Sequence, residues 1–479
     1  MKIRSLVSYK LVTLFTSSSF CFKIVLSENL NRKELMHKDY TSINVLFQEC
    51  GIVVDDIGHD YIDNIKTIVI YAYPIDSLFV CPSCGSISIK KNGSYTRTIK
   101  HIPILGHSCI IKLKQHRLKC KDCNKNFNES CKLTKKYSTI SNQLKVSILY
   151  ECKEKQSFKN ISERFDVSIN TIMRTFNDNV FIDRKSLSRV ICIDEFKADT
   201  EYGKYALIIG DPVKGEILDV LPKRTQDYIY YYFQNLTSEE RKIVQIVITD
   251  MNIAYRTVVR NLFFNSIHIV DRFHWIKLAS DTFNKVRIRF MKEYDKRSNE
   301  TRDIDESREL KLLANTMKSY YKLLIANRHR KEPQFFEEIT KKKINGISLT
   351  RQEIIEFIIN SDKDLETAYW LLQDLYKISI LSSYETFTQD IEEWFADIRK
   401  SKIKEFIKLL ASYKAWMSEI RNSFIIDEKT KKRLTNGFIE GKNNICKVVK
   451  RVGFGYKKFE NLRNRILYID NERLNIKNK

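Results

Sequence analysis

The feature that most constrains the fold is a pair of Cys-x-x-Cys motifs, Cys81 with Cys84 and Cys120 with Cys123. Thiolates three positions apart on a tight turn converge on one ion, and two such turns complete a tetrahedral zinc site. The gap between the motifs exceeds the roughly 15–20 residues of the commonest pattern, and four ordinary buried cysteines are the alternative. Basic, β-rich runs around the motifs favour metal, so we expect one structural Zn²⁺ ion in a zinc-ribbon-like module over residues 81–131.

Two further details belong to this module. Asn92-Gly93 is typical of a tight turn between two strands. Cys109 and Cys131 stand alone, and we interpret them as structural residues. Cysteines used for metal rather than for disulfides favour a reducing, cytoplasmic compartment.

The charge of the chain predicts a polyanionic partner. Its 83 Lys and Arg residues against 59 Asp and Glu give a net charge of +24 and a pI near 9.4. Such an excess suits either nucleic acid or an anionic membrane, but no apolar run is long enough to span a bilayer. We therefore expect a nucleic-acid-binding protein with no membrane association.

The N-terminal residues carry little pattern. Leu11 to Val25 follows basic residues as a signal peptide would, but the polar run Thr16 to Ser19 interrupts it and no clear cleavage site follows. We expect a disordered extension over residues 1–35, and translation from Met36 is a second interpretation. Residues 36–80 then form an N-terminal segment before the zinc module.

Residues 138–182 have the pattern of a helix-turn-helix DNA-binding domain. Its first helix runs through Ile161 and Phe165, and Ser168 is suited to cap the second helix. A helical hairpin packed on its neighbours would show the same apolar spacing. In the DNA-binding interpretation, the second helix presents to the major groove Asn170, Thr171, Arg174 and Asn177.

Beyond Val190 the chain changes to strand-like runs in the order β-β-β-α-β-α-β. Three consecutive strands suit an antiparallel meander, whereas helical crossovers supply parallel strands, so the expected fold class is α/β with a mixed sheet. We assign residues 188–281 to the first part of this core, 282–423 to a long helical insertion and 424–470 to the C-terminal part of the core.

Two acids lie on strand-like runs that we expect to be buried. Asp194 follows Val190-Ile-Cys-Ile, and Asp250 ends Ile246-Val-Ile-Thr. A buried carboxylate needs a cation or a hydrogen-bond donor, and a pair of divalent ions is one such partner. Because side chains alternate along a strand, only one of Asp194 and its neighbour Glu195 can face the metals, and Glu195 stays an alternative ligand.

A distinctive segment follows the helical region. It runs from Asn436 as NGFIEGKNNICKVVKRVGFGYKKF and continues with Asn461, Arg463 and Arg465. This segment resembles the bacterial insertion-sequence transposases of the IS-L-three family, in which Asn-Gly-x-x-Glu-x-x-Asn, Lys-Arg and Phe-x-x-x-Arg-x-Arg elements follow a helical insertion. Asp194-Glu-Phe, Thr249-Asp250-Met and Asp271-Arg-Phe-His274 resemble the family's upstream motifs.

The resemblance implies an RNase H-like core, with Asp194, Asp250 and Glu440 as the acidic DDE triad. Such a triad holds two Mg²⁺ or Mn²⁺ ions that serve phosphodiester chemistry on DNA. The family-like spacing also makes Asp271 and His274 candidate active-site residues. A lone histidine after a strand is more often structural, which is the alternative for His274.

The helix that carries Glu440 adds candidate DNA contacts. Helical spacing places Asn443, Asn444 and Lys447 near the face of Glu440. Basic side chains on a C-terminal helix are often merely solvated, but here we expect them to contact phosphates, at Lys450, Arg451, Lys457, Lys458, Arg463 and Arg465.

The sequence therefore predicts a DDE-type transposase that binds element-end DNA, cleaves it and transfers the strand. An RNase H-like nuclease without strand transfer is one alternative, and an inactive, domesticated DNA-binding regulator is another. We expect double-stranded DNA as the partner, a homodimer or larger assembly on it, and a place in the bacterial cytoplasm at the nucleoid.

Overall fold

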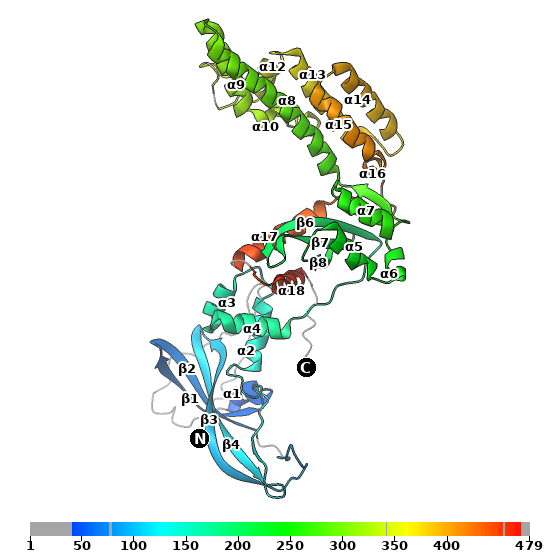
Figure 1. Cartoon of the computed structure of the whole chain (residues 1–479). Helices are drawn as coiled ribbons and strands as arrows, with labels where there is room; N and C mark the ends of the chain where they lie inside the picture. The colour runs from blue at the N-terminus through cyan, green and yellow to red at the C-terminus, as the bar shows by residue number, and fades with distance from the viewer. Residues whose placement is uncertain (1–40, 76–78, 342, 454–455, 471–479) are drawn as a thin grey trace, which may run out of the picture. The chain divides into compact units, whose positions relative to one another are not determined.

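The computed structural model describes residues 41–75, 79–341, 343–453 and 456–470. The expected disordered extension and the alternative start at Met36 lie outside these residues. The chain divides into two compact units, residues 1–180 and 181–479, and each is described by itself (Figure 1). No helix among the described residues has the length and apolar character needed to cross a bilayer.

The first unit is built on a five-stranded mixed sheet in the order β1-β2-β4-β3, with β5 paired to β4. Strands β2 and β4 are parallel, and the other pairs are antiparallel. The segment that we expected to precede the zinc module thus shares one sheet with it. The elements are α1 (Thr41–Gln48), β1 (Ile52–Ile62), β2 (Ile65–Pro74), β3 (Ile89–Ile104), β4 (His107–Cys120) and β5 (Asn126–Asn128).

The prediction of a turn at Asn92-Gly93 is wrong. Strand β3 continues through these residues, and the pairing with β4 shifts between Lys91 and Ser94, so Gly93, with φ +91°, lies in a bulge. The turn between β3 and β4 lies instead at Leu105 and Gly106, both of which have positive φ. Glycine tolerates that conformation at bulges as well as at turns, so the dipeptide alone does not distinguish the two.

Three helices complete the first unit, α2 (Asn142–Glu151), α3 (Phe158–Phe165) and α4 (Ile169–Asn179). The hydroxyl of a serine accepts a hydrogen bond at the start of each, and Ser168 caps α4 as expected. Asp166 ends α3 in the left-handed conformation, which turns the chain sharply into α4. The two helices therefore meet across a short turn.

The second unit contains a five-stranded mixed sheet in the order β10-β9-β6-β7-β8. The first three strands form an antiparallel meander, and β9 and β10 continue the sheet in parallel on the other side of β6, which confirms the expected strand order. The strands are β6 (Val190–Thr200), β7 (Gly203–Asp211), β8 (Glu216–Leu221), β9 (Ile246–Thr249) and β10 (Ile267–Val270).

Helices cover both faces of this sheet. Ile191 and Ile193 of β6 pack with α5 (Gln226–Gln234) and α7 (Ile253–Leu262) in one apolar core. The alternate side chains of β6 face α17 (Gly437–Val452), which lies along that strand, while α18 (Phe459–Asp470) contacts β8 (Figure 1). The short α6 (Ser238–Lys242) precedes β9.

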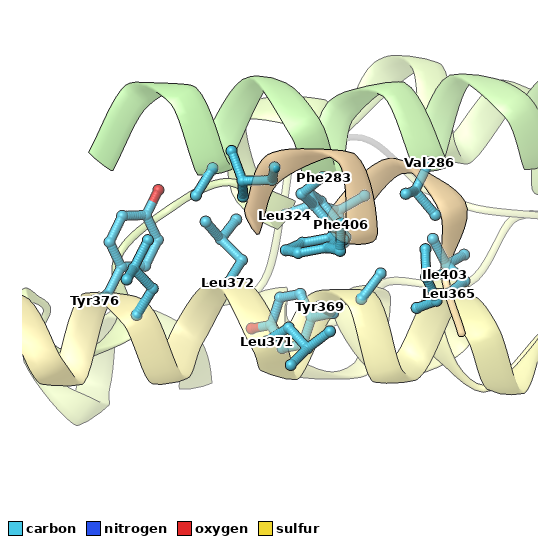
Figure 2. Close-up of a cluster of buried hydrophobic side chains, with 14 of the residues drawn as sticks. Phe283, Val286, Leu324, Leu365, Tyr369, Leu371, Leu372, Tyr376, Ile403 and Phe406 are labelled. Atoms are coloured by element: carbon cyan, nitrogen blue, oxygen red, sulfur yellow. The ribbon is translucent and has the colours of Figure 1, made fainter. Parts of the chain in front are cut away.

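The helical region begins earlier than we expected. Helix α8 starts at Arg272, directly after β10, and runs unbroken to Glu300. Its buried face joins a large apolar core with the later helices, part of which Figure 2 shows around Phe283, Tyr369 and Phe406. The later elements are α9 (Ile304–Ser319), α10 (Tyr321–Leu324), η1 (Arg328–Arg330), α11 (Pro333–Glu337), α12 (Arg351–Ile359), α13 (Lys363–Leu381), α14 (Phe387–Ser401), α15 (Lys404–Ala415) and α16 (Met417–Asn422).

This core yields a stability prediction. Phe283 is fully buried and its ring meets that of Tyr369, so Phe283→Ala should lower the free energy of unfolding of the second unit by about 3–5 kcal/mol. Leu381→Ala is the matched control, because this side chain is 70% exposed and its loss should cost less than about 0.5 kcal/mol. Urea unfolding followed by circular dichroism measures both, and equal effects would contradict the packing described here.

Candidate active site and zinc module

Three aspartates occupy equivalent levels on the three parallel strands of the second unit. Ile193 of β6 pairs with Thr249 of β9, and Thr249 pairs with Val270 of β10. The next residue along the chain is an aspartate in each case: Asp194 within β6, and Asp250 and Asp271 directly after β9 and β10. Neighbouring strands lie about 4.8 Å apart, which brings the backbones at these positions close together.

Asp194 is held from two sides. The amide Nδ2 of the buried Asn443, on α17, donates to its Oδ2 at 2.7 Å, and the backbone N–H of Glu195 donates to its Oδ1 at 2.7 Å. Burial and then the negative charge of Asp250 nevertheless raise the pKa of Asp194 to about 7. Asp250 is thus close enough for its charge to disfavour the ionised form of Asp194.

Asp250 has a histidine partner from the helix that follows the neighbouring strand. Nε2 of His274, in the first turn of α8, lies 2.8 Å from Oδ1 of Asp250. Burial acts to lower the pKa of His274, but the hydrogen bond and charge of Asp250, together with Asp271 and Asp194, outweigh it and raise that pKa. The spacing Asp271-x-x-His274 therefore corresponds to a direct contact with Asp250.

Glu195 lies on the opposite face of β6. Both oxygens of its side chain accept hydrogen bonds from Arg224. Tyr255, a buried residue of α7, lies on this side, and burial and the charge of Glu195 raise the pKa of its hydroxyl. The alternation of side chains thus separates Asp194 from Glu195, and the latter already has a guanidinium partner.

Asp271 joins two segments that are far apart in sequence. Its side chain caps α8 by accepting from the backbone N–H of Phe273 at 3.1 Å, and it also accepts from the backbone N–H of Asn436 at 2.9 Å. Asn436 is the N-cap residue that directly precedes α17. Asp271 therefore fixes the start of the helix that carries Glu440 and Asn443.

Glu440 lies on the exposed side of α17, one turn before Asn443. In the described part of the chain, one group of three or more metal-ligating side chains has all its ligand atoms within 4.8 Å of one another, and that group consists of cysteines. Asp194, Asp250 and Glu440 therefore do not form a cluster of this kind, although Asp194 and Asp250 lie near each other. Residues three apart on a helix lie near one face, so Glu440 borders the face that reaches Asp194.

The expected DNA contacts on α17 and α18 fall into two groups. Asn444, Lys447, Arg451, Lys457 and Lys458 are exposed. Four others are engaged or buried in the fold, since Asn443 binds Asp194, Lys450 pairs with Asp199, Arg463 pairs with Asp219 at 2.7 Å, and Arg465 is 1% exposed.

On α4, Asn170, Arg174 and Asn177 are exposed, as the expected arrangement requires. Thr171 is half-buried, and its hydroxyl lies 2.9 Å from that of Ser168, the residue that caps the helix. Thr171 therefore has a local structural role at the start of α4. Ile172 and Phe176 form the buried side of the same helix.

The four cysteines of the two motifs converge in the first unit. Their sulfur atoms all lie within 4.8 Å of one another, with Cys81 3.5 Å from Cys123 and Cys84 3.6 Å from Cys120. Zinc–thiolate bonds of about 2.3 Å at tetrahedral angles give sulfur separations of about 3.8 Å, which these distances approach. The cluster therefore supports one structural zinc ion, and neither Cys109 nor Cys131 belongs to it.

Sequence reasoning missed three contacts around the acids. Arg224 and Tyr255 were not singled out, although each lies close to Glu195. His268 of β10 was also missed, and its Nε2 lies 2.8 Å from the hydroxyl of Thr249, the residue before Asp250. A histidine and a threonine on apolar, neighbouring strands were the available signal, because such buried polar groups need partners.

Comparison with known proteins agrees with this geometry. A family model described as "Transposase", of the ISL3 (IS-L-three) group, matches residues 191–466 and spans both strands with the acid pair and helix α17. A second model, described as the zinc finger of transposases IS204, IS1001, IS1096 and IS1165, matches residues 77–123 and contains the four cysteines.

A curated relative extends the similarity over most of the chain. The transposase for insertion sequence element IS1001 of Bordetella parapertussis is 20% identical over 403 residues, which cover 82% of this chain and 89% of the relative. The first family model alone matches more than half of the chain. The chain therefore belongs to the ISL3 family of insertion-sequence transposases.

Proposed function

We propose that the protein binds the ends of its insertion sequence, cleaves the DNA there and transfers the freed strand, with Asp194, Asp250 and Glu440 as the acidic triad. The observation that carries the proposal is the carboxylate pair itself. Asp194 and Asp250 occupy adjacent positions on parallel strands, and Asn443 reaches Asp194 from the helix that bears Glu440. Strand β6, the end of β9 and helix α17 are distant in sequence and thus come together around this carboxylate pair.

An RNase H-like core is part of this proposal. Its support is the sheet of the second unit, in which an antiparallel meander is continued by two parallel strands reached through helices. Within that scheme, residues 188–281 and 424–470 form the catalytic core, and 282–423 form the helical insertion. Residues 81–131 form the zinc module and 138–182 the helix-turn-helix domain.

The residues of the acid pair suit two Mg²⁺ or Mn²⁺ ions. Carboxylate oxygens are hard ligands of the kind these ions prefer. The pKa of Asp194 is raised by burial and then by the charge of Asp250, and a bound cation would favour the ionised carboxylate. When bound, two such ions activate the attacking oxygen and stabilise the leaving oxygen in an in-line phosphoryl transfer. Asp194, Asp250 and Glu440 would hold them.

The surrounding residues orient this pair. Asn443 fixes the carboxylate of Asp194 through a hydrogen bond, and His274 fixes that of Asp250. Asp271 ties the start of α17 to the start of α8, so that Glu440 and His274 keep a constant relation. Water or a 3′-hydroxyl would attack the phosphorus while the P–O3′ bond breaks and the 3′-oxygen leaves as a hydroxyl, so no covalent protein intermediate forms.

DNA binding is assigned to two surfaces. On α4, Asn170, Arg174 and Asn177 supply exposed groups for the major groove. On α17, a stripe at positions 444, 447 and 451 continues along the helix from Glu440 and supplies phosphate contacts, with Lys457 and Lys458 beyond it. Arg463 and Arg465 are left out of this surface, because the fold engages or buries them. Pairing two DNA ends requires a homodimer or a larger assembly.

The triad is tested by amide substitution. Asp194→Asn, Asp250→Asn and Glu440→Gln should each lower cleavage and joining by about a thousandfold or more, because each removes a charge that holds the ions. Binding to end DNA should persist. Asp227→Asn, an exposed acid at the start of α5, is the matched control and should retain activity.

The assay uses end-labelled duplexes for cleavage and precut ends for joining. Loss of both steps in each amide variant is the expected result. Retained joining in any one of them would remove that residue from the triad. Wild-type protein that cuts but never joins would make it a nuclease, and wild-type protein that only binds would make it a regulator.

Metal binding should depend on pH in a defined direction. The raised pKa of Asp194 means that the metal-free folded protein keeps this proton to about pH 7, so its contribution to stability is lost as the pH rises through that value. The raised pKa of His274 acts in the same direction. Mg²⁺ requires the ionised carboxylate, so the increase in melting temperature that it causes should grow from about pH 6 to about pH 8.

Scanning calorimetry with and without Mg²⁺ measures this effect. In Asp194→Asn the increase should be small at both pH values, while Asp227→Asn should behave as the wild type. An increase that is equal at both pH values in the wild type would contradict metal binding by Asp194.

The zinc site is tested by its content and by cysteine substitution. Purified protein should hold about one tightly bound zinc ion per chain. Cys84→Ser should lower this content and destabilise the first unit, whereas Cys109→Ala, outside the cluster, should leave the content unchanged. Elemental analysis by mass spectrometry provides the measurement, and zinc-free native protein would refute the site.

A further inference from the structure

An exposed phenylalanine stands directly beside the candidate active site. Phe273 is 55% exposed, although it lies in the first turn of a long helix between Arg272 and His274. Its ring centroid is 5.5 Å from the ring of His274, with the planes at 85°, and His274 in turn contacts Asp250. The exposed ring of Phe273 therefore belongs to the residue next to His274, which contacts Asp250.

The backbone of Phe273 is held firmly. Its N–H donates to Oδ2 of Asp271, and the same carboxylate binds Asn436 at the start of α17. On its other side the chain continues into Trp275, which is fully buried in the helical core. A ring that projects from so fixed a turn is pre-positioned for a partner.

The surroundings of the ring have the chemistry of a nucleotide site. Lys277, one turn further along α8, places its Nζ 5.8 Å from the ring centroid. An aromatic face with a neighbouring ammonium group can bind a base by stacking and its phosphate by charge.

We propose that Phe273 stacks on a base of the DNA strand that is drawn out of the helix next to the scissile phosphate, while Lys277 binds a phosphate of the same strand. The inference rests on the proposed function, since it places the reacting strand at the acid pair. Enzymes that act within a duplex need the strand distorted there, and stacking on a protein ring offsets the cost of removing a base from the DNA stack.

A matched phenylalanine distinguishes this role from ordinary surface exposure. Phe264 is 72% exposed and precedes β10, whereas Phe273 follows it, so the two rings lie at opposite ends of the same strand. Single exposed apolar residues are common on protein surfaces. Phe264 therefore shows what the loss of an exposed phenylalanine ring costs when the ring lies away from the candidate active site.

The test uses the full-length protein and a duplex that carries the inverted repeat flanking its gene, with 2-aminopurine at single positions around the cleavage site. With wild-type protein, fluorescence should rise severalfold at one position, and Phe273→Ala should abolish this rise and slow cleavage about 10- to 100-fold. Phe264→Ala should match the wild type, and Phe273→Trp should keep cleavage near the wild-type rate.

An abasic nucleotide at the responsive position provides a readout that a purely structural role would not change. It removes the cost of unstacking, so it should restore cleavage by Phe273→Ala severalfold while leaving the wild type little altered. The melting temperature of Phe273→Ala should stay close to that of the wild type. If it falls, Phe273→Leu, which keeps apolar bulk without a stacking face, should still cleave slowly.

The outcomes separate this inference from the proposed function. Wild-type cleavage with no fluorescent position, or with equal rates for Phe273→Ala and Phe264→Ala, would overturn the role of Phe273 alone. Absence of any cleavage by the wild type would overturn both. A rescue of Phe273→Ala by an abasic site at every position tested would mean general DNA loosening, and would also overturn the stacking role.

Discussion

The arrangement of the second unit depends on holding two carboxylates side by side on adjacent parallel strands. Burial, and then the charge of Asp250, raise the pKa of Asp194. Two side chains from different helices hold these carboxylates, Asn443 at Asp194 and His274 at Asp250. The order of the strands places the two carboxylates next to each other, the start of α8 supplies His274, and the packing of α17 supplies Asn443.

The chain returns to the sheet after a long helical region, and Asp271 links the two ends of that region. Its buried carboxylate caps α8 and also accepts a hydrogen bond from the backbone N–H of Asn436, directly before α17. Arg256 of α7 makes a second link, since it forms an ion pair with the buried Glu419 of α16. The helical region is thus joined to the core at its start and at its end, so the position of Glu440 does not depend on the covalent connection alone.

The sequence predicted the parts of this arrangement that follow from local pattern. The strand runs, the cap at Ser168 and each Cys-x-x-Cys motif are patterns of residues a few positions apart, and the structure agrees with the predictions made from them. The prediction of a turn at Gly93 was wrong, because a β-bulge accommodates glycine at positive φ as readily as a turn does. The hydrogen bond from Asn443 to Asp194 and the burial of Arg465 could not be predicted, because they depend on which face of each C-terminal helix packs inward.

The continuity of α8 connects the helical region directly to the candidate active site. His274 contacts Asp250, while the next residue, Trp275, lies in the apolar core against Phe387 and Tyr413. The hydroxyl of Tyr413 also donates to the backbone carbonyl of Trp275 at 2.5 Å. Any shift of that core must therefore move the turn that carries Asp271, Phe273 and His274. The packing of the helical region therefore supports this turn against the strands.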